Sequence, residues 1–243
     1  MEAKTHIFPN PDLLVEALGT SFKEAEEEAD SRGEPLHVAV PGGSTPKKFF
    51  QYLSGPFADS INWDRIHFYW GDERCVPPDH PESNFGMTKK ALLDKIDIPI
   101  KNIHRIQGES DPESEILRYS HEIKTTVSTK DQSLPQFDWI ILGLGADGHT
   151  ASLFPKMISS LVDEQICTIA THPQSGQKRI SLTLSILNNA KRVTFLVTGK
   201  SKTEVVTSIL MNKSDNLRFP AALVSPHSGK LDWYLDQEAG RLL

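Results

Sequence analysis

The sequence is poor in cysteine and contains no long apolar run. Only two of its 243 residues are cysteines, Cys75 and Cys167, and they lie far apart in the chain. The stretch 1–5 lacks the apolar core of a signal peptide. No apolar stretch approaches the roughly 20 residues that span a bilayer. We therefore expect a reduced, cytoplasmic protein without disulfides and without a membrane partner.

Positive charge is also scarce, and it forms no tract. The chain carries 26 Lys and Arg against 32 Asp and Glu, which gives a formal net charge of −6. An acidic chain without a basic stretch is poorly suited to bind nucleic acid or an anionic membrane surface. Any site for an anion must therefore be local, built from a few side chains.

What the sequence does contain is an alternation of helix-like and strand-like segments. An amphipathic helix is predicted from Pro11 to a stop at Gly33. Short apolar or alternating segments predict strands over 36–40, 65–70, 137–142, 165–170, 178–184 and 192–198. A polar segment predicts a surface loop over 124–136. In a chain that is 38% hydrophobic, this alternation predicts one α/β domain over residues 1–243, with a mostly parallel sheet flanked by helices on both faces.

The run from 143 to 155 places an acid and an imidazole two residues apart, directly after a predicted strand. Its glycines permit a tight turn, and Asp147 can orient the ring of His149 or act beside it. The run also fits the dinucleotide pattern G-x-G-x-x-G, which requires a full helix after the glycines. Phe154-Pro155 would end such a helix after about one turn, which favours an acid–base site. A plain glycine turn with a surface histidine remains the alternative.

A second glycine-containing loop, 41–46, follows the first predicted strand. Thr45 is a natural N-cap and Pro46 suits the first helical position, so we expect a helix to start here. Backbone N–H groups and the positive helix end would then converge on an anion. This arrangement predicts a phosphate cradle made by Gly42, Gly43, Ser44 and Thr45, although capping alone would explain the threonine and the proline.

Charged side chains gather in the stretch 70–78, again where a predicted strand ends. Arg74 offers a bidentate fork for phosphate or carboxylate, while Asp72 and Glu73 could orient that fork or face a ligand. The alternative is a solvated loop with a local ion pair, which stabilises a protein little. Ser83-Asn84 then begins a helix and needs no role beyond capping.

Two further cationic positions belong to predicted strands in the second half. Side chains alternate across the strand 178–184, so Arg179 and Ser181 share one face. Lys200 follows the strand 192–198 and opens a helix, where it could neutralise a phosphate, although a lysine is exposed by default. Because open α/β sheets bind ligands at the carboxyl ends of their strands, we expect these positions to meet in one site.

Four segments, in this order, resemble those of the 6-phosphogluconolactonases, whose superfamily also holds the glucosamine-6-phosphate deaminases. They are the loop 41–46, the stretch from Gly71-Asp72-Glu73-Arg74 to Ser83-Asn84, the run 143–155, and Phe219-Pro220-Ala221-Ala222-Leu223 with Trp233 and Asp236. The resemblance implies a modified Rossmann-like fold and hydrolysis of 6-phospho-D-glucono-1,5-lactone in the oxidative pentose phosphate pathway. It implies no metal and no organic cofactor, and it leaves the oligomeric state open.

The resemblance also implies residue roles. Its pattern makes His149 the base that deprotonates the attacking water and then protonates the ring oxygen, with Asp147 beside it. Such proton transfers are worth about 10²- to 10⁴-fold in rate. The groups it implies for phosphate are the loop with Ser44 and Thr45, Arg179 and Lys200, with Arg74 as a further anion contact. Together with Gly42, Gly43 and Asp72 from the residue patterns above, they make up the predicted substrate site.

Two other functions compete with lactone hydrolysis. The deaminases follow their Asp-Gly-His with an apolar-Asn-Glu-Pro ending whose glutamate supports the histidine, whereas Leu153-Phe154-Pro155 stands here. A phenylalanine has no group that could replace that carboxylate. A sugar-phosphate-binding regulator without turnover is the second alternative, and the intact Asp147 and His149 pair argues against it. Serine-hydrolase and zinc sites are disfavoured because the chain lacks a G-x-S-x-G elbow and H-x-x-x-H spacing.

Overall fold

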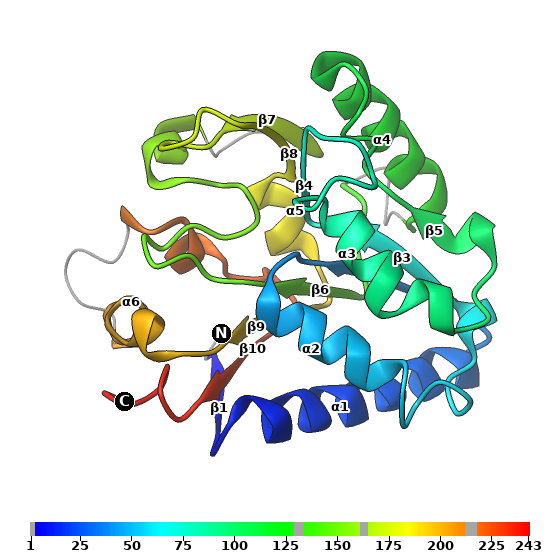
Figure 1. Cartoon of the computed structure of the whole chain (residues 1–243), viewed down its shortest axis with the longest axis horizontal. Coiled ribbons are helices and arrows are strands. Elements are labelled where there is room, and N and C mark those ends of the chain that lie inside the picture. Colours follow the sequence, from blue (N-terminus) through cyan, green and yellow to red (C-terminus); the bar gives the residue numbers. More distant parts are fainter. Residues whose placement is uncertain (1–2, 129–133, 161–164, 212–217) are drawn as a thin grey trace.

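The centre of the molecule is a seven-stranded, fully parallel sheet with the order β1-β10-β9-β6-β2-β3-β5 (Figure 1). The computed structural model describes residues 3–128, 134–160, 165–211 and 218–243. The strands of this sheet are β1 (Lys4–Phe8), β2 (Leu36–Val40), β3 (Ile66–Trp70), β5 (Ile103–His104), β6 (Trp139–Leu142), β9 (Arg192–Val197) and β10 (Lys230–Asp236). Every residue of β2 and β6 is buried, as expected for central strands covered on both faces.

Helices cover both faces of this sheet. They are α1 (Pro11–Ser31), α2 (Ser44–Leu53), α3 (Asn84–Ala91), α4 (Pro112–Thr126), α5 (Leu184–Asn189) and α6 (Thr203–Leu210). In Figure 1, α1 and α2 lie side by side below the strands, while α4 and α5 lie above them. The side chain of Asn10 caps α1 by accepting bonds from two backbone N–H groups, and Ser83 caps α3 as expected. The predicted α/β class, with helices on both faces, is confirmed.

A second sheet was not expected from the sequence. It is antiparallel, with the order β4-β8-β7, and consists of β4 (Asp72–Arg74), β7 (Cys167–Thr171) and β8 (Lys178–Leu182). The small sheet stands above the large one in Figure 1. It joins the large sheet at Gly71, whose N–H donates to the carbonyl of Val40 and whose carbonyl accepts from Leu182. The strand predicted over 178–184 is therefore present, but its partners come from distant parts of the chain.

Two predicted boundaries are wrong. The helix α2 begins at Ser44, with Gly43 at the N-cap, whereas the sequence suggested Thr45 as the cap. Gly43 has a φ of 111°, a conformation that glycine adopts without strain, so the backbone turns two residues earlier than the threonine signal indicated. The helix α4 continues to Thr126, into the segment expected to be a loop, and 129–133 lies outside the described residues.

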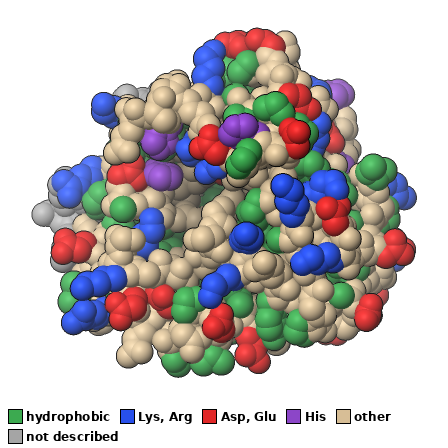
Figure 2. All heavy atoms as spheres, in the orientation of Figure 1, with side chains coloured by type: hydrophobic (Ala, Val, Ile, Leu, Met, Phe, Trp, Pro, Cys, Tyr) green, Lys and Arg blue, Asp and Glu red, His purple; other side chains and the backbone are tan. Residues whose placement is uncertain are grey.

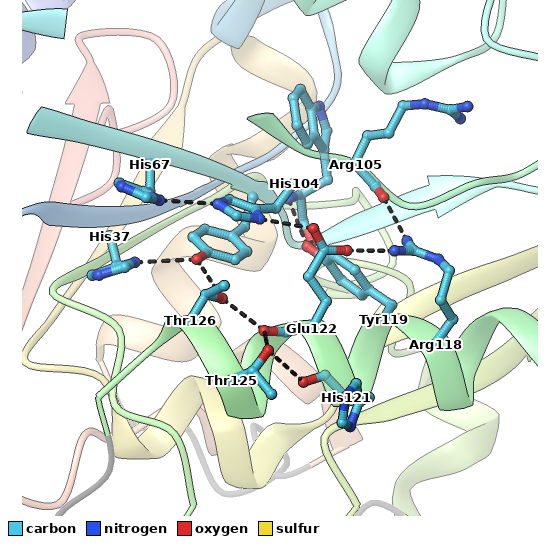
Figure 3. A network of polar contacts seen from close by, with 12 residues as sticks. His37, His67, His104, Arg105, Arg118, Tyr119, His121, Glu122, Thr125 and Thr126 are labelled. Atoms are coloured by element: carbon cyan, nitrogen blue, oxygen red, sulfur yellow. Dashed lines mark hydrogen bonds and ion pairs between the residues drawn. The ribbon is translucent and has the colours of Figure 1, made fainter. Parts of the chain in front are cut away.

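A buried polar network joins the amino-terminal ends of β2 and β3 to α4 (Figure 3). His37 Nδ1 lies 3.1 Å from the hydroxyl of Tyr69, which donates to Thr126 on α4. His67 Nδ1 lies 3.0 Å from Nε2 of His104. His37 and His67 are the second residues of their strands, so this network lies at the end of the sheet opposite the loops 41–46 and 71–78.

Among the helices of the described residues, none has the length and apolar composition to cross a membrane.

Candidate active site

The loops after β2 and β6 open onto one cavity of about 380 Å³. These two strands are neighbours in the large sheet. The next strand of that sheet to follow each of them in the chain lies on its outer side, β3 beside β2 and β9 beside β6. Their carboxyl ends therefore form the switch point at which open α/β sheets bind ligands. The cavity is lined by residues 41–46 and 143–145, the end of β9, and the side chains of Asp72, Arg74, Asn84, His149, Ala151, Arg179, Ser201 and Lys202.

The phosphate loop, residues 41–46, carries the first turn of α2 into this cavity. No side chain caps this helix, because its N-cap residue is Gly43. Thr45 Oγ1, inside the first turn, lies 2.7 Å from Thr198 Oγ1, just after β9. The positive end of the helix is thus left facing the cavity, as an anion-binding helix start requires. The residues predicted to form a phosphate cradle therefore all line one hollow, and their contact with phosphate remains a prediction.

Asp147 and His149 are joined by a short contact in the turn after β6. Asp147 Oδ1 lies 2.6 Å from His149 Nδ1 and also accepts the backbone N–H of His149. The hydrogen bond with His149 lowers the pKa of the Asp147 carboxyl to about 2, although partial burial opposes the shift. An ionised carboxylate only accepts, so Nδ1 carries the proton. The lone pair of neutral His149 is then left on Nε2, which is the state a general base needs.

The turn around this pair is tightly packed. A Cβ atom at Gly145 would lie 2.1 Å from His149 Nδ1 and 2.5 Å from Asp147 Oδ1, so only glycine fits there. Ala151 has a φ of 47°, a strained value for a residue with a side chain. In the part of this segment that the structure describes, up to residue 160, the glycines are followed by a 3₁₀ helix over Pro155–Ser160 and not by a long α-helix. The structure therefore agrees with the argument against a dinucleotide site.

Phe154 is buried behind the histidine. Its ring centroid lies 5.0 Å from the imidazole of His149, and the guanidinium of Arg179 lies 5.7 Å from the same centroid. This apolar side chain stands at the position where the deaminase pattern has a carboxylate. His149 therefore receives a ring contact from this position and a charged contact from Asp147.

Three cations line the cavity, and one of them differs from expectation. Arg74 and Arg179 are there as predicted, but Lys200 is exposed and outside the lining, and Lys202 takes its place. A 3₁₀ turn over Lys200–Lys202 produces this two-residue difference. Burial lowers the pKa of Lys202, whereas the charge of Asp147 raises it. Basic and acidic side chains are otherwise interspersed over the face that Figure 2 shows.

Asn84 is a lining residue to which the sequence assigned only a capping role. Its Nδ2 donates to the backbone carbonyl of Asp72 at 2.9 Å. Asp72 is buried, and it accepts a 2.6 Å bond from the hydroxyl of Ser152. The signal for Asn84 was its place after Ser83 at a helix start, which does not show which way its side chain points.

Within the described residues, no three His, Cys, Asp or Glu side chains gather closely enough to hold a metal ion.

The fold and the cavity define a class of protein: a modified Rossmann-like α/β protein with a glycine-containing helix start and an aspartate–histidine pair at the switch point of its sheet. A family model described as glucosamine-6-phosphate isomerases/6-phosphogluconolactonase matches residues 9–233. The chain is 48% identical to a 6-phosphogluconolactonase of Haemophilus influenzae over 97% of this chain and 98% of the relative. It is 37% identical to one of Synechocystis over 100% of this chain and 99% of that relative.

Solved structures agree with these sequence relationships. A crystal structure of a devB protein superposes with a TM-score of 0.93 at 42% identity, covering 98% of both chains. The 6-phosphogluconolactonase of Trypanosoma brucei superposes with a TM-score of 0.88 at 25% identity, covering 100% of this chain and 99% of the other. The chain belongs to the glucosamine-6-phosphate isomerase/6-phosphogluconolactonase family.

Proposed function

We propose that this protein hydrolyses 6-phospho-D-glucono-1,5-lactone to 6-phospho-D-gluconate, with His149 as the base. The observation that carries the proposal is that His149, oriented by the Asp147 carboxylate, opens onto the same cavity as the anion loop and three cations. The 6-phosphogluconolactonase names of its relatives support the same reaction. A cavity of about 380 Å³ also falls in the usual range for small-molecule sites, about 300–1,000 Å³.

The proposed mechanism begins with phosphate binding at one end of the cavity. The start of α2 and the ammonium of Lys202 hold the phosphate, which places the lactone ring between the loop and His149. His149 Nε2 takes a proton from water as that water attacks C1. The tetrahedral intermediate carries an oxyanion, which Arg74 or N–H groups of the glycine turn stabilise.

The same histidine completes the reaction. Protonated His149 remains paired with the Asp147 carboxylate, and it donates its Nε2 proton to the ring oxygen as the C1–O bond breaks. The products are a carboxylic acid at C1, which releases its proton to solvent to become the carboxylate, and a hydroxyl at C5, and the histidine returns to its neutral state. No cofactor enters this scheme, because water is the only co-reactant that the hydrolysis requires.

Phe154 favours lactone hydrolysis over deamination. Its buried ring packs against His149, and it offers no carboxylate to support a proton relay.

We further propose that residues 1–243 form one domain that acts in the cytoplasm. The proposal of one domain is supported by the large sheet, whose strands are drawn from Lys4 through Asp236.

The test is acid release from freshly generated 6-phosphogluconolactone, measured against the spontaneous rate. Wild-type protein should exceed that rate, and His149→Ala should lose about 10²- to 10⁴-fold in kcat while its folding is retained. No acceleration by the wild type would refute the function, and full activity of the variant would refute the mechanism. Ammonia release from glucosamine-6-phosphate would favour the deaminase instead.

A further inference from the structure

Asn84 lies where two walls of the cavity meet. It is the first residue of α3, it is 3% exposed, and its side chain lines the cavity. On one side, its Nδ2 lies 2.9 Å from the carbonyl of Asp72 and 3.3 Å from Asp72 Oδ1. On the other side, its Oδ1 would lie 1.7 Å from a Cβ atom added to Gly42. The carboxamide is thus wedged between the phosphate loop and β4.

Glu73 fixes the place where α3 begins, and so fixes Asn84. Its buried carboxylate accepts the backbone N–H groups of Arg74, Asn84 and Phe85, each at 2.8 Å, and the hydroxyl of Ser83 at 3.0 Å. Four donors on one buried carboxylate leave little freedom for the first turn of the helix. Asn84 is therefore held rigidly against β4.

Asp72 extends this line of contacts to the turn that carries His149. Its Oδ2 accepts the hydroxyl of Ser152 at 2.6 Å, and the backbone N–H of Ser152 donates to Ser181 on β8. Asp72, Asn84 and Ser152 are all buried. A continuous series of close contacts therefore runs from Gly42 through Asn84 and Asp72 to Ser152, three residues after His149.

We infer that Asn84 is a positioning residue that sets the separation between the phosphate loop and the Asp147–His149 turn. The inference rests on the proposed function, because a lactone bound by its phosphate at the loop must present C1 to His149 at the other wall. A misplacement of about 1 Å between a bound substrate and a catalytic group can cost about 100-fold in rate. Loss of the spacer should therefore reduce kcat much more than it raises KM.

The first experiment compares Asn84→Ala with Asn102→Ala. Asn102 is a matched control, because it is also a buried asparagine whose Nδ2 donates to a backbone carbonyl, that of Asp64. Both variants should lose similar thermal stability. Only Asn84→Ala should lower kcat, by about 10- to 100-fold, with KM within about threefold of wild type. Equal kcat values in the two variants would overturn the inference, and so would a raised KM with an unchanged kcat.

The second experiment uses Gly42→Ala alone and together with Asn84→Ala. The three atoms nearest to an added Cβ at Gly42 all belong to Asn84, and the φ of Gly42 lies outside the left-handed region. The alanine at position 42 should therefore reduce activity because of the Asn84 carboxamide. The double variant should be as active as Asn84→Ala, whereas losses that multiply would overturn the inference.

Binding of inorganic phosphate, measured by calorimetry, separates this inference from the proposed reaction. Gly42→Ala should weaken phosphate binding, and adding Asn84→Ala should restore it. This coupling is measured without turnover. A wild-type protein that hydrolyses no lactone would therefore refute the proposed function alone, and a phosphate affinity that Asn84→Ala does not restore would refute the contact on which the inference rests.

Discussion

Arg74 and Arg179 lie directly opposite each other in the antiparallel pair of β4 and β8. Like charges at such positions destabilise a sheet. Burial lowers the pKa of Arg179, and the charge of Arg74 lowers it further. Arg179 also lies over the ring of Phe154, so it cannot easily swing into solvent. The two strands therefore hold two guanidinium groups at the edge of the cavity before any anion arrives.

The first prediction is that Arg179→Met weakens substrate binding without lowering the stability of the fold. Relief of the like-charge contact is worth about 0.2–1 kcal/mol, so the free energy of unfolding should stay the same or rise. KM should rise about tenfold, because a hydrogen bond to a charged group contributes about 1.5–3 kcal/mol. Urea unfolding and steady-state kinetics measure the two effects. Arg65→Met, at an exposed arginine paired with Asp30, is the control. A less stable Arg179→Met variant with normal KM would contradict the argument.

The second prediction concerns the tautomer of His149. In Asp147→Asn, the amide can present an N–H to Nδ1, which leaves the ring proton on Nε2 and removes the base from the cavity. We expect kcat to fall about 10²- to 10⁴-fold. Phosphate affinity should be unchanged, since the loop 41–46 lies at the other wall. Retention of wild-type kcat would show that the carboxylate does not orient the histidine.

The third prediction distinguishes two lysines that are two residues apart. Lys202→Ala should raise KM about tenfold, because the lysine lines the cavity where the phosphate is proposed to bind. Lys200→Ala should have a much smaller effect, because Lys200 is exposed and outside the lining. Parallel KM measurements at one ionic strength check both variants. The reverse order of effects would restore the assignment made from the sequence.

Local signals predicted the parts of the fold that local interactions determine. The apolar strand β2, the cap at Ser83 and the turn ended by Phe154-Pro155 all follow from residues close together in the chain. Because parallel strands end at one edge of a sheet, the Asp147–His149 pair and the phosphate loop could be expected to meet.

The rest depended on contacts between distant residues. The small antiparallel sheet pairs Asp72 with Ser181 and Arg74 with Arg179, and no pattern within either strand specifies that register. The direction of the Asn84 side chain depends on Glu73 and Gly42, which approach it only in the folded chain. The sequence also did not indicate that Lys202 lines the cavity while Lys200 does not, since a 3₁₀ turn and an α-helical turn place successive side chains differently.

The last prediction concerns the histidine network of Figure 3. Burial lowers the pKa of His37 from 6.5 to about 4. The charge of Asp138 raises this pKa, whereas His104 and Lys191 lower it further. Burial also lowers the pKa of His67 to about 4, with His37, His104 and Lys101 acting in the same direction. The unfolded chain therefore binds more protons than the folded chain between about pH 4 and 6.5.

Stability should consequently fall as the pH falls through this window, because protonation favours the unfolded chain. For His37 alone, the free energy of unfolding should drop by about 2 kcal/mol between pH 7 and pH 5. His37→Asn keeps an N–H near the position of Nδ1 for Tyr69 but cannot be protonated, so its stability should depend less on pH. His227→Asn, at an exposed histidine, should keep the wild-type dependence. Urea unfolding at both pH values measures the difference, and an equally steep dependence in His37→Asn would exclude His37 as its source.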